Sequence, residues 1–193
     1  MYADTPSPQR STSAHDALVR EAMAASQADE AVAAIGLFRR AIEADPGVAS
    51  THLLLAAELA QAGRDAEAES AYAAALWVAP TLHVARFQLG LLQLCGLRTM
   101  AALLTWQPLF SLPDGHALRS AVHGIAALIA DNRAEAVVHL REAISACHDN
   151  PPLAADLGRI VAALGEVATP ATPPAQDSAH VLLANYRPES PGH

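Results

Sequence analysis

Small side chains recur along this chain at a fixed interval of 34 residues. Three columns of small residues and one column of large apolar residues each have a member in four successive segments. The columns are Ala22, Ala56, Gly90 and Gly124; Ala34, Ala68, Ala102 and Ala136; Ala41, Ala75, Leu109 and Ala143; and Phe38, Tyr72, Trp106 and Leu140. Only Leu109 breaks the small-residue rule. A fixed period of this length is the signature of stacked structural repeats.

The spacing within each repeat predicts a pair of antiparallel helices. The second and third small residues follow the first by 12 and 19 positions, which places them on a second helix after a turn. Small side chains allow two helix axes to approach closely, because packed cores tolerate little extra volume. The large residue is expected to fill the space between one pair and the next. Pro46 and Pro80 close the first two repeats, since proline can begin a helix but cannot continue one.

The polar and helix-breaking residues predict where these pairs begin and end. The first pair should run from about His15 to Ala44 and the second from about Val48 to Val78, with a break at Gly63. In the third repeat, Pro108 should shorten or displace the second helix. The fourth repeat covers about 116–148. After it, segment 151–166 has Leu153, Leu157, Ile160, Val161 and Leu164 on one helical face, which predicts a lone helix that caps the open end of the stack.

Two stretches resemble a known repeat. ADEAVAAIGLFRRAIEADP (28–46) and GRDAEAESAYAAALWVAP (63–80) are similar to the second helix and closing turn of the tetratricopeptide repeat, a helix–turn–helix unit of 34 residues. The resemblance covers about residues 15–165 and implies an all-α fold, a right-handed α-solenoid of antiparallel helix pairs. We expect a disordered segment 1–14, a domain 15–166 with repeats at about 15–48, 49–82, 83–116 and 117–150 and a capping helix 151–166, and a Pro-rich mobile tail 167–193.

Composition and charge narrow the class of protein. Hydrophobic residues make up 52% of the chain and charged residues 17%, which supports a folded core and, at this length, one domain. The net charge of −8 disfavours nucleic acid and anionic membranes as partners, because both attract basic surfaces. The N-terminus has no apolar signal region, and no apolar stretch is long enough for membrane insertion. Cys95 and Cys147 have no paired spacing and are expected to be thiols. These features predict a cytoplasmic location.

The chain carries no motif that indicates catalysis. It lacks the GxxxxGK[ST] and GxGxxG phosphate loops, HExxH and CxxC. His116 and His123 are seven positions apart, and His139 and Cys147 are eight apart; neither spacing gives the adjacent-turn pairing of a metal site. No nucleophile has an identifiable base. We therefore expect no enzyme activity, no cofactor and no metal.

The resemblance implies that the first helix of each pair lines a concave groove. It assigns partner binding to Met23, Leu53, Phe87, Leu91, Leu94, Ala121, Ile125 and Leu128. This wall is apolar. It lacks the Lys, Arg and Asn residues with which some tetratricopeptide proteins hold the acidic tails of chaperones, apart from Arg159. An apolar wall fits an apolar peptide or helix. Two alternatives stay open: these residues face one another inside the stack, or the apolar segment 178–186 of the tail covers them.

The leading functional hypothesis is a non-enzymatic adaptor that binds another protein or peptide through apolar anchors. A second hypothesis is a chaperone similar to those of bacterial type III secretion, with a hydrophobic client. A third is an accessory regulatory subunit of a larger bacterial enzyme or assembly complex. A homodimer is a further option, because the apolar wall or the irregular third repeat could serve as a contact between copies.

Overall fold

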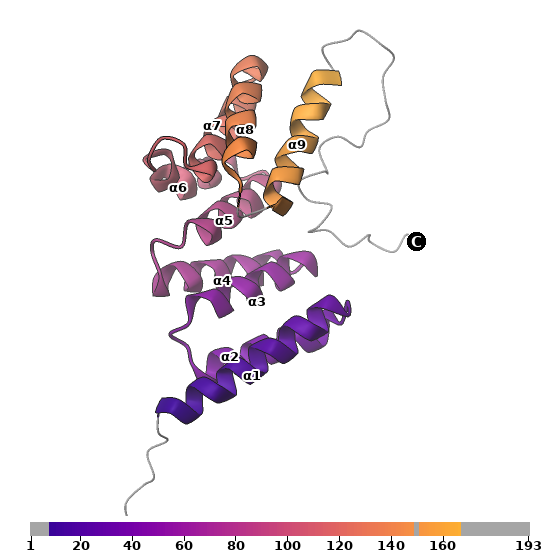
Figure 1. Ribbon diagram of the computed structural model, residues 1–193, viewed down its shortest axis with the longest axis vertical. Coiled ribbons are helices and arrows are strands. Elements are labelled where there is room, and N and C mark those ends of the chain that lie inside the picture. The colour runs from indigo at the N-terminus through magenta and orange to yellow at the C-terminus, as the bar shows by residue number, and fades with distance from the viewer. Residues whose placement is uncertain (1–7, 149–150, 167–193) are drawn as a thin grey trace, which may run out of the picture. The chain divides into compact units, whose positions relative to one another are not determined.

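Helices form all the regular structure in residues 8–148 and 151–166, the part of the chain that this computed structural model describes (Figure 1). The helices are α1 (Pro8–Gln27), α2 (Ala31–Ala44), α3 (Ala49–Gln61), α4 (Asp65–Val78), α5 (His83–Cys95), α6 (Thr99–Phe110), α7 (Ala117–Ile129), α8 (Arg133–Ala146) and α9 (Pro151–Glu166). α1 begins earlier than the start expected near His15. The segments 1–7 and 167–193, for which disorder and mobility were predicted, lie outside the described residues.

The helix boundaries follow the period of the sequence. The second helices α2, α4, α6 and α8 begin at residues 31, 65, 99 and 133, and the first helices α3, α5, α7 and α9 begin at 49, 83, 117 and 151. Within the pairs, α1 packs against α2, α3 against α4, and α7 against α8. Between pairs, α2 packs against α3, α6 against α7, and α8 against α9. The prediction of an all-α fold of successive helix pairs is therefore confirmed.

The described residues divide into two compact units. The N-terminal unit ends at Leu92 and the C-terminal unit begins at Gln93, so the boundary falls within α5. The sequence alone suggested one domain. A linear series of repeats explains the division, because each repeat contacts only its immediate neighbours.

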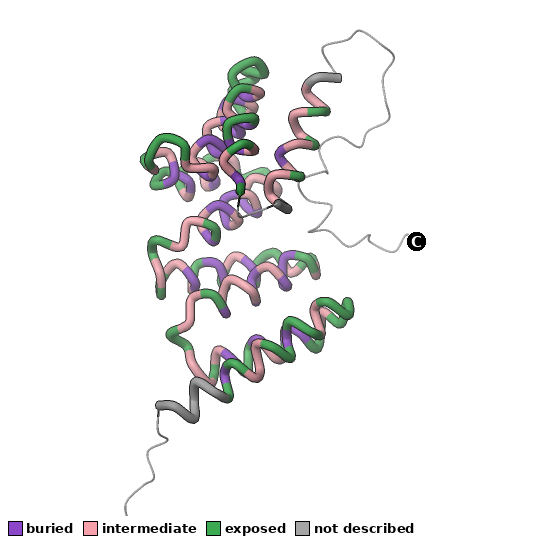
Figure 2. Tube along the Cα trace, in the orientation of Figure 1, coloured by how far each residue is buried: buried purple, intermediate pink, exposed green. Residues whose placement is uncertain are grey.

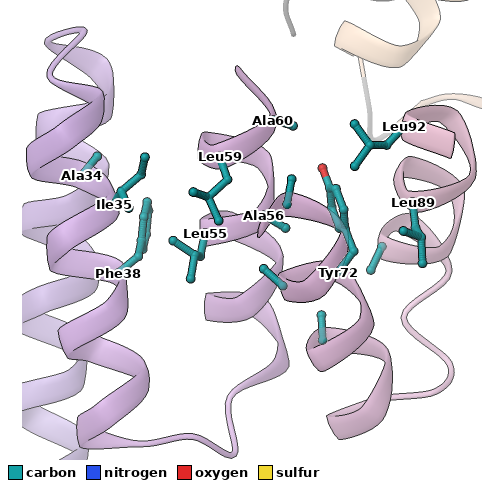
Figure 3. Packing of buried hydrophobic residues seen from close by; sticks show 14 of the residues in the cluster. Ala34, Ile35, Phe38, Leu55, Ala56, Leu59, Ala60, Tyr72, Leu89 and Leu92 are labelled. Carbon is teal, nitrogen blue, oxygen red and sulfur yellow. The ribbon is translucent and has the colours of Figure 1, made fainter. Parts of the chain in front are cut away.

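The four columns of the sequence form the interior of these units. All sixteen column residues are buried, including the misfit Leu109, and Figure 2 shows buried and exposed positions alternating along the helices. In the N-terminal unit, Ile35 and Phe38 of α2 point toward Leu55 and Leu59 of α3 (Figure 3). In the C-terminal unit, Gly124 of α7 approaches Leu140 of α8 so closely that an added Cβ would lie 2.7 Å from Leu140 Cγ. The small residues thus permit close helix contact.

A left-handed residue ends the first helix of each complete pair. These residues also repeat every 34 positions: Asp29 (φ 61°), Gly63 (φ 70°), Leu97 (φ 60°) and Asp131 (φ 57°). After each of them, the next amide N–H donates to the carbonyl five residues earlier in the chain, as from Arg64 to Leu59 (2.9 Å) and from Arg98 to Gln93 (2.9 Å). This bond satisfies a carbonyl that the helix end would leave free. Leucine is an unusual residue for this backbone conformation.

The third repeat is irregular in the predicted way. α6 has 12 residues, whereas α2, α4 and α8 each have 14. Pro108 lies in the last turn of α6 and has no N–H to offer to the carbonyl of Leu104, which weakens the helix end. A longer connection follows, with Gly115 in the left-handed region at φ 80°. The shortened second helix is confirmed.

Candidate partner-binding surfaces

In the N-terminal unit, the residues predicted to bind a partner differ in how exposed their side chains are. Met23 on α1 is 43% exposed, and Leu53 on α3 and Leu91 on α5 are half-buried. Phe87 on α5 is only 3% exposed. Its ring therefore belongs to the packed interior and offers no surface to a partner.

The predicted partner-binding residues of the C-terminal unit also differ in exposure. Leu94 in the last turn of α5 and Leu128 in the last turn of α7 are half-buried. Ala121 and Ile125 of α7 are 0% and 3% exposed. The alternative that these wall residues face the interior thus describes Phe87, Ala121 and Ile125. Five residues keep partly exposed apolar side chains: Met23, Leu53, Leu91, Leu94 and Leu128.

Two polar pairs join α1 to α3, one of them buried and the other part-buried, and sequence reasoning missed both. Ser26 Oγ donates to Glu58 Oε2 at 2.7 Å, and Glu58 is only 6% exposed. The ring of His15 places Nε2 at 2.9 Å from Thr51 Oγ1, and both residues are buried. Buried polar groups need such partners, so these pairs favour one register between the two helices. Glu58 is the only charged residue in the segment 49–61, and this isolated charge was the feature of the sequence that could have indicated a polar contact there.

An open pocket of about 440 Å³ lies between α2, α3 and α4. Its apolar surface comes from Ile42, Leu55, Leu59 and Ala71, and its polar surface from Arg39, Glu43, His52, Glu67 and Ser70. Leu55 and Leu59 are 7% and 2% exposed and belong to the hydrophobic core, so the core itself forms part of the pocket wall. This volume lies within the range of about 300–1,000 Å³ that is usual for binding pockets.

Charged side chains stand beside this pocket. Arg39 Nη2 on α2 donates to Glu67 Oε2 on α4 at 2.7 Å. Arg64 donates to the same carboxylate twice, from Nε at 2.7 Å and from Nη2 at 2.8 Å. The hydrogen bonds from Arg64 and the positive charges of Arg64 and Arg39 lower the pKa of Glu67 below its usual value. Glu67 therefore stays ionised at neutral pH and binds both Arg64 and Arg39, of which Arg39 lines the pocket.

The C-terminal unit has an aromatic cluster on α6, α7 and α8, the counterparts of the helices α2, α3 and α4 that form the pocket. The ring of Phe110 on α6 meets His123 on α7 edge-on at 5.0 Å, and His123 lies 5.3 Å from His139 on α8. Burial lowers the pKa of His123, and electrostatic repulsion from His139 and Arg119 lowers it further. His139 Nδ1 lies 3.2 Å from Glu142 and its Nε2 lies 3.8 Å from Glu135.

This arrangement differs from the histidine pairs considered in the sequence. His123 meets His139 of the next helix, whereas His116 precedes α7 and accepts a hydrogen bond at Nδ1 from the Leu118 amide (3.2 Å). Within residues 8–148 and 151–166, no three His, Cys, Asp or Glu side chains converge as they would to hold a metal ion. None of the described helices is long and apolar enough to cross a lipid bilayer.

These elements form an α-helical repeat fold of tetratricopeptide type, built from helix pairs that repeat every 34 residues. Solved structures support this fold. Two structures of MamA match at 16% identity each: one has a TM-score of 0.56 and covers 76% of this chain and 96% of the other, and the second has a TM-score of 0.57 and covers 89% and 91%.

PilF of Pseudomonas aeruginosa matches at 21% identity with a TM-score of 0.59, over 84% of this chain and 79% of the other. MamA and PilF are both tetratricopeptide-repeat proteins. No protein-family model matches the sequence, and a search of the curated proteins also finds no match. The likeness to solved structures therefore establishes the fold.

Proposed function

We propose that this protein is a non-enzymatic scaffold that binds an apolar segment of another protein. The observation that carries the proposal is the pocket between α2, α3 and α4, where Leu55 and Leu59 of the core line an open space of about 440 Å³. An apolar side chain that enters this space is removed from water, which is the main favourable term in most protein association. The tetratricopeptide-type fold supports the same reading.

The chemistry of the pocket indicates what its ligand contains. Its apolar wall has room for one or two large aliphatic or aromatic side chains. Around it, Arg39 and Glu67 present both signs of charge, and Ser70 presents a hydroxyl. A peptide with an apolar anchor and polar flanking residues satisfies both parts. Apolar pockets that have a few placed polar groups use those groups to orient the ligand.

The partly exposed residues of the first helices extend this proposal. Met23, Leu53 and Leu91 of the N-terminal unit and Leu94 and Leu128 of the C-terminal unit are proposed to contact the partner as well. Their side chains are apolar and partly exposed at the surface. Whether the tail segment 178–186 covers these residues is a separate prediction about residues outside those described.

Two narrower roles use the same surfaces. A chaperone for a hydrophobic client would keep that client in solution when the two are produced together. An accessory regulatory subunit would instead purify in a fixed ratio with a larger bacterial enzyme or assembly complex. A homodimer, a cytoplasmic location and the absence of catalysis also stay predictions. The net charge of −8 supports a protein partner over nucleic acid or an anionic membrane.

The proposal can be tested by selecting random displayed peptides on the full chain. The enriched peptides should share one or two large apolar residues, and Ile42→Glu, which places a charge in the pocket, should weaken their binding at least about tenfold, or about 1.4 kcal/mol. Ile144→Glu is the matched control, because Ile144 is the fourth-repeat counterpart of Ile42 and is also half-buried. Leu91→Glu tests the first helices separately.

The outcomes discriminate between the surfaces. Loss of binding in Ile42→Glu alone supports the pocket. Loss in Leu91→Glu alone moves the site to the first helices and refutes the pocket, while the scaffold function stands. If neither variant loses binding, or if no peptide is enriched, the proposed function is wrong. Circular dichroism of each variant checks that helix content is unchanged.

A further inference from the structure

The outer face of α6 carries exposed apolar side chains that the pocket does not use. Leu97 in the turn before α6 is 90% exposed, and Met100 and Leu104 on the helix are 70% and 71% exposed. Met100 and Leu104 are four residues apart and therefore lie on one helix face. α6 has no charged residue in its whole length. We name Leu97, Met100 and Leu104 the α6 outer patch.

The corresponding positions of the other repeats show that this patch is specific to the third repeat. Leu97 corresponds to Asp29, Gly63 and Asp131; Met100 to Val32, Ala66 and Ala134; and Leu104 to Gly36, Ser70 and Val138. The other second helices therefore have at most one large apolar residue at these three positions. Singly exposed apolar residues are normal, whereas a group of them marks a contact surface. The repeat architecture itself does not require this patch.

The backbone at Leu97 supports the same conclusion. Its φ is 60°, a left-handed conformation that is unfavourable for a branched side chain and that Gly63 adopts without strain in the second repeat. The hydrogen bonds from Leu97 N to Leu94 O and from Arg98 N to Gln93 O hold this turn in place, both at 2.9 Å. Because the side chain is 90% exposed, burial against the described residues does not offset the strain. The repeat requires a left-handed residue at this position but does not require leucine, because aspartate or glycine stands there in the other repeats. Strained residues are enriched at functional sites.

We propose that the α6 outer patch is a second docking surface, and that its occupant is an amphipathic helix of a different protein with apolar anchors one turn apart and basic residues beside them. The three side chains together expose an apolar area on the order of 250 Å². This area follows from the transfer free energy of such side chains divided by the free energy per unit of buried apolar area. A stable dimer needs about 800 Å² from each partner. The patch by itself is therefore too small to hold a second copy, and it matches the short anchor row of a single helix.

Charge points to the same occupant. The chain carries a net charge of −8, so a second copy is repelled at long range, whereas a helix with arginine or lysine beside its anchors is attracted. The uncharged surface of α6 leaves the apolar contact free of buried charges. This surface lies in the C-terminal unit and the pocket lies in the N-terminal unit. The inference therefore goes beyond the proposed function and does not depend on it.

The test places a photo-crosslinking amino acid at Met100 in the full chain, within the cells from which the protein comes. The matched control carries the same crosslinker at Ala134, the exposed counterpart on α8. We expect Met100 to crosslink to another protein, through a segment with apolar residues at helical spacing and basic neighbours, and Ala134 to give no such product. Mass spectrometry identifies the crosslinked segment.

A synthetic peptide of that segment then completes the test by fluorescence anisotropy. Leu104→Glu should weaken its binding at least about tenfold, and Val138→Glu, the counterpart on α8, should change it less than about twofold; binding should also fall as salt is raised. The proposal is overturned if the product is a second copy, if it is segment 178–186 of the same chain, if the crosslinked segment is acidic, or if Met100 and Ala134 give equal yields or none. Met100→Glu provides a second variant, and circular dichroism checks that both variants are folded.

Discussion

Replacing Gly124 with alanine tests the close approach of α7 and α8 directly. The new Cβ would lie 2.7 Å from Leu140 Cγ and 2.8 Å from Leu140 Cδ2. It would also lie 3.2 Å from the backbone nitrogen of Leu140. Leu140 is 0% exposed, so its side chain has little space into which it can move. The helices must therefore separate, or Leu140 must adopt a strained rotamer.

Two opposing effects set the magnitude. Alanine favours a helix interior over glycine by about 1 kcal/mol. Overpacking a core lowers the free energy of unfolding by about 1–3 kcal/mol. We therefore expect Gly124→Ala to destabilise the C-terminal unit by about 1 kcal/mol in total. A Cβ added to Gly158 on α9 would meet no side chain or neighbouring helix of the described residues within 4 Å, so Gly158→Ala should stabilise the same unit by about 0.5–1 kcal/mol.

Urea unfolding provides the assay. Trp106 is 0% exposed on α6 and reports on the C-terminal unit, whereas Trp77 is 88% exposed and should be replaced with phenylalanine to isolate that signal. The two alanine variants should shift the unfolding midpoint in opposite directions. Equal shifts in one direction would refute the close approach at Gly124. As a further check, Leu140→Ala should add less destabilisation in the Gly124→Ala background than in the wild type, because the two residues are in contact.

Three further predictions concern other positions. Leu97→Gly should raise the free energy of unfolding by about 0.5–1 kcal/mol, because it removes the strain of the left-handed residue, and Leu97→Ala should leave it within about 0.5 kcal/mol; urea unfolding measures both. Phe87→Ala should lower it by about 3–5 kcal/mol, as for a buried aromatic residue, and a change near zero would place Phe87 at the surface. The folded-state pKa of His123 lies below its usual value of 6.5, so the unfolded chain binds a proton at this residue more readily than the folded chain does. The stability of the C-terminal unit should therefore fall as pH drops below about 6.5. Thermal unfolding at several pH values measures this, and the His123→Gln variant should show a weaker pH dependence.

The two proposed surfaces predict separate effects of mutation. Ile42→Glu should act on the pocket of the N-terminal unit and Leu104→Glu on the α6 outer patch of the C-terminal unit. A scaffold that holds two partners should lose one in each variant and retain the other. If one substitution removes both partners, the two surfaces are coupled and are not independent sites.

The sequence by itself determined the helix pairs and the sixteen column residues of the core. Helix pairs follow from a local pattern, since small residues at a fixed interval specify where two axes meet. For that reason all sixteen column residues are buried, and Pro108 shortens α6 as predicted. The turn at Gly63 was also evident, because glycine is the usual residue for a left-handed helix end.

Only the tertiary structure decided how deep each side chain lies and which distant residues meet. Phe87, Ala121 and Ile125 share a predicted helix face with Leu91 and Leu128, yet the first three are buried. Helical periodicity gives the direction of a side chain but not the distance to the neighbouring helices. The Arg39–Glu67 pair and the pocket beside it join residues from separate helices. These features arise from the packing of helices against one another, which no local pattern encodes.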